Sequence, residues 1–318
     1  MNLKKQVGSA DGTTLHERVA AWLELLDGCG SKPTRKRVHA LRVATLRLQA
    51  ELEHDISELP RASHQAQAML QFSKQAEKLR QVLGPVREID VWIGTLRGLR
   101  TSLSESGEYV PRSMQECLRG IDRLEDRLHR KRRTAGKKLV ASIEKKSDRF
   151  VKAAEKLETA PEDFQPSDAA GIANDLIAHF GRVRAEFPEL DEANLHEFRK
   201  RIKMVRYLAE MHAGADRECA RIATQMRKLQ SAIGEWHDWQ ALAEETGHMH
   251  HAWSKPLAEL FESVSKETFE TALETAYSVT ARMLGKDAER AEPLRGADRK
   301  LPAHSEPGPH MASEEKLA

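Results

Sequence analysis

The spacing of apolar residues constrains the fold of this chain more than any other feature of its sequence. Over most of the 318 residues, apolar side chains recur at helical spacing, as Val19, Trp22 and Leu26 do near the N-terminus. This spacing places them on one face of an α-helix, whereas a half-buried strand alternates at every second position. Clusters of β-branched residues, which favour strands, are nearly absent. The sequence therefore predicts an all-α protein.

Glycine and proline divide the periodic pattern into separate predicted helices, because both disfavour the interior of a helix. Gly84-Pro85, for example, is a typical end signal. The helices expected in the first half span about 15–27, 35–56, 62–83, 87–103 and 111–157. Those expected in the second half span about 168–186, 191–212, 216–233, 236–248, 250–264 and 266–284.

The periodic pattern is interrupted once and then ends before the C-terminus. Pro161 and Pro166 bracket a segment with little apolar content, and after Gly285 apolar residues thin out while four prolines appear. Such a composition cannot build a packed core. The expected parts are an N-terminal extension (1–12), a first helical repeat (about 13–157), a linker (about 158–167), a second helical repeat (about 168–284) and a disordered tail (285–318).

Two short motifs occur twice in the chain, in the same order. Val38-His39-Ala40-Leu41-Arg42 corresponds to Leu195-His196-Glu197-Phe198-Arg199, which begins 157 residues later. The segment 78–88 aligns without a gap to 228–238, at an offset of 150 residues. Because the offsets differ, one loop between the second and third helices differs in length. The sequence predicts two pseudo-symmetric helical-bundle repeats.

A cationic helix face begins at the histidine motif in each copy. In the second copy, four residues fall within an arc of roughly 80° beside the apolar stripe. They are His196, Arg199, Lys203 and Arg206. The corresponding arc of the first copy holds Arg35, His39, Arg42, Leu46 and Gln49, with Arg47 to one side. The second copy therefore carries the fuller cationic face.

A charged helix face is usually just solvated, but two features of these faces favour a bound anion. Like charges three or four positions apart destabilise a helix by a few tenths of a kcal/mol per pair, and cations beside a buried face lose hydration. A bound polyanion relieves both costs, and ten residues of helix extend about 15 Å, which is room for several phosphates. Lys78 and Lys228, at matching positions in the two copies, are predicted to extend the site.

The motifs resemble those of the CHAD family, the conserved histidine α-helical domain. That family has His-x-x-Arg opening a basic helix that continues to Lys-x-x-Arg-Tyr, and Lys203-Met204-Val205-Arg206-Tyr207 matches the latter. Its Leu-Gly-x-x-Arg-Asp-x-Asp-Val motif appears here over residues 83–91, with Glu88 in place of the first aspartate. The resemblance covers about residues 13–284. The chain lacks the Glu-x-Glu-x-Lys strand motif of the CYTH domain, so it is similar to a stand-alone member.

The resemblance implies a fold and a function. The fold would be two four-helix-bundle-like halves with a basic groove or pore between them. The function would be binding of inorganic polyphosphate, with association to polyphosphate granules and their proteins. In this family the first copy usually reads Arg-Arg-Leu-Arg where the present chain has Leu46-Arg47-Leu48-Gln49. Two cations are missing there, which predicts a ligand contact dominated by the second copy.

Some candidate residues have structural interpretations as well. We expect His39 and His196 to be neutral, because neighbouring cations lower the pKa of an imidazole, and to donate hydrogen bonds to phosphate. Glu88 and Asp238 are expected at the starts of helices, where negative charge is favourable, or as braces that hold an arginine in position. The segment 127–146 carries nine Lys or Arg and one Glu. It is interpreted either as a solvated helix face or as an accessory surface that steers polyanions to the site.

The predicted function is binding without catalysis. The sequence contains no nucleophile motif, Gly-rich phosphate loop or dinucleotide fingerprint, and it predicts no metal site or cofactor. Binding of single-stranded nucleic acid or another polyanion is one alternative, although few aromatic residues accompany the basic ones for base stacking. A helical scaffold for an acidic protein partner is another. No apolar run is long enough for a membrane span and no signal peptide is apparent, so a cytoplasmic protein is expected.

Overall fold

The computed structural model describes residues 14–60, 63–104, 112–159 and 169–285, and it confirms the all-α prediction. Within these ranges the chain is helical, without strands. The helices are α1 (Leu15–Ser31), α2 (Arg35–Glu58), α3 (His64–Ser104), α4 (Arg112–Glu158), α5 (Ala169–Glu186), α6 (Leu195–Arg201), α7 (Lys203–His212), α8 (Arg217–Gly247) and α9 (Ser254–Leu284). The predicted N-terminal extension, and almost all of the predicted linker and tail, lie outside the described residues.

Several predicted helix ends are wrong, because helices continue through them. α3 passes through Gly84-Pro85 as one helix, where the sequence predicted an end. The apolar face runs on across this point, with Leu83 and Val86 at most 1% exposed, so packing holds the helix together despite the local signal. In the same way α8 joins the predicted helices 216–233 and 236–248, and α9 joins 250–264 and 266–284.

The continuity of these helices corrects two site predictions. Glu88 lies in the middle of α3 and Asp238 in the middle of α8, so neither carboxylate interacts with a helix start. The opposite error occurs at 191–212, where one predicted helix is divided into α6 and α7 at Ile202. The Ile202 carbonyl accepts a hydrogen bond from Nε2 of the buried Gln230 side chain at 3.3 Å.

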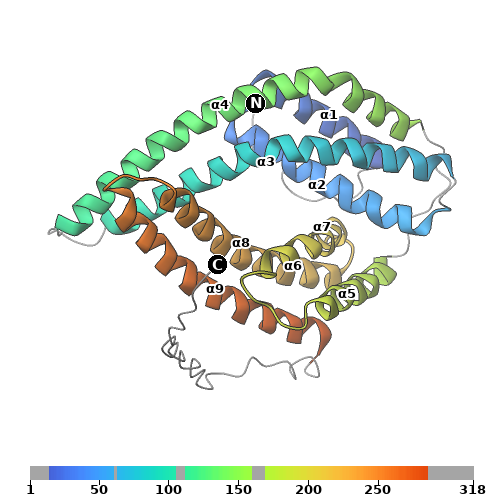
Figure 1. The fold of residues 1–318 in the computed structure, drawn as a ribbon. Coiled ribbons are helices and arrows are strands. Elements are labelled where there is room, and N and C mark those ends of the chain that lie inside the picture. The colour runs from blue at the N-terminus through green and yellow to red at the C-terminus, as the bar shows by residue number, and fades with distance from the viewer. Residues whose placement is uncertain (1–13, 61–62, 105–111, 160–168, 286–318) are drawn as a thin grey trace, which may run out of the picture.

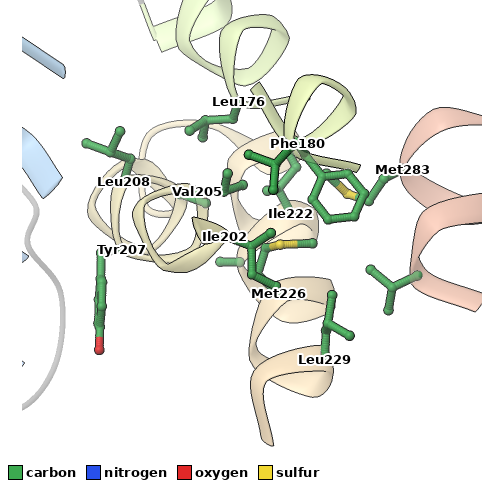
Figure 2. Packing of buried hydrophobic residues seen from close by; sticks show 14 of the residues in the cluster. Leu176, Phe180, Ile202, Val205, Tyr207, Leu208, Ile222, Met226, Leu229 and Met283 are labelled. Carbon is green, nitrogen blue, oxygen red and sulfur yellow. The ribbon is translucent and has the colours of Figure 1, made fainter. Parts of the chain in front are cut away.

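Three apolar clusters hold the helices together. The first lies among α1–α4 and contains Trp22 and Phe72. The second lies among α5–α9 and includes two residues of α2, and Figure 2 shows its packing around Phe180. The third is formed by the C-terminal parts of α3 and α8 and the N-terminal parts of α4 and α9, with Trp92 of α3 and Phe261 of α9 among its members. Figure 1 shows the long α3–α4 and α8–α9 pairs meeting on one side of the molecule. The two halves of the chain therefore share a core there.

A second contact between the halves explains the missing cations of the first copy. Leu46 and Ala50 of α2 belong to the apolar cluster of the second half, and Leu46 is only 8% exposed. Gln49 is 6% exposed. Leu46 packs against the opposite half, whereas the Gln49 side chain donates a hydrogen bond to the Ser73 carbonyl oxygen of α3 at 3.4 Å. A cation at either position would be buried. Leu46 and Ala50 therefore belong to the face of α2 that meets the second half, where α2 lies beside α7.

Candidate functional site

The first turn of α2 positions the cations of the first copy. The Thr34 hydroxyl caps the helix by accepting a hydrogen bond from the Arg37 N–H at 3.3 Å. The Arg35 guanidinium lies directly against Gly94 of α3, where a Cβ atom would be 2.9 Å from one of its nitrogens. One helical turn further on, His39 is exposed. A glycine at 94 is therefore what allows Arg35 to lie close to α3.

Arg42 and Arg199 make the same contact in the two copies. Arg42 donates to the Arg80 carbonyl oxygen at 3.4 Å, and Arg199 donates to the Gln230 carbonyl oxygen at 3.1 Å. Arg42 and Arg199 are 157 residues apart, whereas Arg80 and Gln230 are 150 apart, which are the two offsets found in the sequence. The shared contact supports the alignment of the copies. Arg199 also lies on Gly234, 2.9 Å from the position of a Cβ atom.

The cations of the two copies lie close enough to influence one another. Partial burial, and then the charges of Arg87, Arg35 and Arg206, lower the pKa of His39. Since Arg206 belongs to α7 and His39 to α2, this coupling crosses between the halves. We refer to the residues that take part as the cationic cluster. They are Arg35, Arg42, Arg80, Arg87, Arg199, Lys203 and Arg206.

Lys203 is the most strongly perturbed cation of the cationic cluster. Burial, followed by the charges of Arg199, Arg42 and Arg80, lowers the pKa of the Lys203 ammonium to about 7. An ammonium ion is strongly hydrated, so it is disfavoured where water is partly excluded and other cations are near. Burial, reinforced by the neighbouring cations, therefore favours loss of the Lys203 proton near neutral pH.

The histidines of the second copy form a pair. The rings of His196 and His237 lie 4.1 Å apart between centroids, at an angle of 39°. Burial is the first cause that lowers the pKa of both, to about 4 for His237, and the neighbouring cations add to it. The predicted direction for His39 and His196 is confirmed, although burial outweighs the cations as its cause. Nδ1 of His196 and Nδ1 of His237 are both buried without a hydrogen-bond partner.

Glu210 neutralises one end of the cationic face. Its carboxylate lies 2.9 Å from Arg206, 3.2 Å from Arg227 and 3.3 Å from Arg47. The sequence predicts Arg206 and Arg47 as polyphosphate ligands, and the structure pairs both with this carboxylate. Only the i,i+4 relation of Arg206 to Glu210 was visible in the sequence.

Two cavities adjoin the cationic cluster and share Thr95 of α3. One, of about 600 Å³, is lined by Arg199 and Arg206 on one side and by α3 and α8 on the others. The second, of about 410 Å³, is lined by Arg35 and Arg87. One cavity is therefore lined by cations of the second copy and the other by cations of the first, with Thr95 common to both.

Comparison with protein families assigns the chain. The CHAD domain family matches residues 13–246. The chain belongs to this family. No curated protein matches it. The matched residues end within α8, so α9 of this CHAD domain, which packs along α8, lies beyond them. The predicted domain end at residue 284 stays a prediction.

The structure places the predicted ligands of this CHAD domain unequally. Arg35, His39, Arg42, Arg199, Lys203 and Arg206 belong to or border the cationic cluster, as described above. Lys78 and Lys228 are exposed and are not among the residues that line the two cavities. Sequence reasoning missed Arg80 and Arg87, although Arg87 occupies the position of His237 in the repeat.

Carboxylates limit the positive charge of the larger cavity. Asp238 lines it, and burial raises the pKa of this carboxyl to about 6, opposed by Arg199 and Arg87. Glu88, whose pKa is raised by burial, interacts electrostatically with Arg42 and Asp238. Both carboxylates therefore lie beside the arginines that the sequence analysis selected.

No described helix is long and apolar enough to cross a membrane.

Proposed function

We propose that this CHAD domain binds inorganic polyphosphate, without catalysis, in a groove formed by the two cavities and the cationic cluster. The supporting observation is the coupling of cations across the halves, with Lys203 of α7 affected by Arg42 of α2 and Arg80 of α3. These side chains approach from several helices, so their mutual repulsion is part of the folded state. A linear chain of phosphates supplies negative charge repeatedly along such a groove.

The mechanism is charge neutralisation. Arginine guanidinium groups can bind two phosphate oxygens at once, and lysine acts as a point charge. Arg199 is anchored through Nε to the Gln230 carbonyl, which fixes one edge of its guanidinium. Lys203, whose pKa is about 7, gains a proton when phosphate lies beside it. Binding thus restores a charge that the free protein has partly lost.

The surroundings of the cationic cluster favour a phosphate chain over nucleic acid. Sequence-tolerant binding of single strands requires exposed aromatic faces for base stacking. Tyr207 and Trp239, the aromatic residues beside Arg206 and in the larger cavity, are 7% and 8% exposed. Neither side chain can offer a full face to a base. Association with polyphosphate granules in the cytoplasm, and with the proteins of those granules, is part of the same proposal.

Competition between two polyanions tests the proposal. The affinity for long-chain polyphosphate is measured against single-stranded RNA of equal charge, over a range of salt concentrations. We expect tighter binding of polyphosphate and a fall of roughly 0.7 log unit per log unit of salt for each phosphate contact. Arg199→Ala should weaken binding, whereas Lys78→Ala should not, since Arg199 lines the larger cavity and Lys78 is exposed and lines neither. Equal affinity for RNA, or equal loss in the two variants, would contradict the proposal.

Absence of hydrolysis is the second expectation. Incubation of the protein with polyphosphate or a nucleoside triphosphate, with and without divalent metal, should release no phosphate. Phosphate release that a point substitution in the cationic cluster abolishes would show that the domain is an enzyme.

A further inference from the structure

The basic segment of α4 has a surplus of unpaired charge. Among its nine Lys and Arg residues, Arg127 and Lys131 pair with Glu245 of α8 at 4.0 and 2.5 Å, and Arg132 pairs with the buried Asp90 at 2.8 Å. Within the described residues the other six have no ion-pair partner. They are Arg130, Arg133, Lys137, Lys138, Lys145 and Lys146. All except Lys146 are exposed.

Part of this charge lies beside the start of α2. Arg132 donates a hydrogen bond to the Pro33 carbonyl oxygen at 2.6 Å, and a Cβ atom on Gly136 would lie 3.8 Å from the Pro33 ring. This face of α4 therefore packs on the segment leading into α2. Arg133 and Lys137 each follow a contact residue by one position, so they lie about 100° further round the helix, toward solvent.

The start of α2 adds its own cations. Arg35, Lys36 and Arg37 are exposed in its first turn, which contains no acidic residue. Cations are unfavourable at this end of a helix, where the macrodipole is positive. On α4, no carboxylate occurs between Arg127 and Ile143. We call this combined basic surface the entry surface. It consists of Arg35, Lys36, Arg37, Arg130, Arg133 and Lys137.

We propose that the entry surface extends the polyphosphate groove at its Arg35 end, so that long chains contact it and short chains do not. Arg35 lines the smaller cavity and also belongs to the first turn of α2, so it connects the two surfaces. From Arg130 to Lys137 the helix adds about 10 Å of basic face. The inference depends on the proposed function and assigns to this domain a preference for chain length.

The test uses two probes and two matched triple variants. Arg130→Gln, Arg133→Gln and Lys137→Gln together remove three charges from the entry surface. Arg182→Gln, Lys255→Gln and Lys266→Gln remove three exposed charges from α5 and α9. Each protein is titrated with tripolyphosphate and with long-chain polyphosphate over a range of salt, and thermal melts confirm folding.

The entry-surface variant should lose affinity for long chains only. We expect it to bind long-chain polyphosphate roughly tenfold more weakly, with a log–log salt slope shallower by about 2, as three lost contacts imply. Its affinity for tripolyphosphate should change by less than about twofold, because screening limits the reach of each charge to about 8 Å. The control variant should bind both probes as the wild type does.

Three results would overturn the inference and leave the proposed function intact. They are an equal loss for both chain lengths, an equal loss in the control variant, and no loss at all. If the unmodified protein binds neither phosphate probe, the proposed function itself fails.

Discussion

The protonation of Lys203 gives the most direct test of the cationic cluster. Its pKa lies at about 7 instead of the ordinary 10.5, mainly because of burial and then because of Arg199 and Arg42. In the free protein this side chain is charged at pH 6 and mostly neutral at pH 9. If bound phosphate restores the ordinary pKa, binding above pH 7 takes up one proton.

The size of the effect follows from linkage. Each pH unit between 7 and 10 costs about 1.4 kcal/mol to protonate Lys203 on binding. Between pH 7 and pH 9 the affinity for polyphosphate should therefore fall by up to about fiftyfold. Lys203→Arg should remove this dependence, because the guanidinium stays charged throughout the range.

The assay is a titration of both proteins with the same polyphosphate at constant ionic strength from pH 6.5 to pH 9. Any titration of the ligand itself then affects the two proteins equally. Calorimetry in two buffers of different ionisation enthalpy should also report proton uptake by the wild type and less by Lys203→Arg. Parallel pH profiles for the two proteins would refute the argument that Lys203 faces the bound phosphates.

The same shift predicts how stability depends on pH. The folded pKa of Lys203 is depressed, so the unfolded chain binds more protons between pH 7 and 10.5, and this contribution to stability rises with pH. Lys203→Met removes the dependence. The free energy of unfolding of the variant minus that of the wild type should be about 2–3 kcal/mol larger at pH 6 than at pH 9, so the variant gains most stability at low pH. Denaturant melts at both pH values measure it.

Three further substitutions examine the surroundings of the cluster. Glu210→Gln should raise polyphosphate affinity severalfold and lower the melting temperature, because three arginines lose the carboxylate that they share (Arg47, Arg206 and Arg227). Glu218→Gln, which removes the ion pair of Arg221 alone, is the control in the same titration and thermal melt. Gly234→Ala should weaken polyphosphate binding severalfold by displacing the Arg199 guanidinium. Gly171→Ala is the control, because nothing lies within 4 Å of the added methyl group. Unchanged affinity in both variants would mean that the position of Arg199 does not affect binding. Leu46→Lys introduces a cation on α2 but should lower the free energy of unfolding by about 2–4 kcal/mol, because residue 46 is buried against the second half. A stable variant that binds polyphosphate more tightly would contradict this.

Much of this architecture is determined locally and was therefore visible in the sequence. Apolar spacing predicts helices because the α-helix repeats every 3.6 residues whatever its surroundings. The duplicated His-x-x-Arg motif identified Arg42 and Arg199, and the structure shows that they make equivalent contacts. The family assignment also followed from these motifs.

Tertiary structure decided where helices end and which charges are neutralised. Gly84-Pro85 is a local end signal, but the buried face of Leu83 and Val86 favours one continuous helix, and packing energy exceeds the preference of two residues. From the sequence alone, Leu46 marks the loss of a cationic ligand, whereas the fold shows that it packs in the apolar cluster of the second half. Glu210 joins α2, α7 and α8 through its arginines, and no local pattern shows that Arg47, far away in sequence, comes within 3.3 Å of it. Burial and long-range contact depend on how the halves pack, which is why the sequence located the cations but only the fold showed which of them are paired.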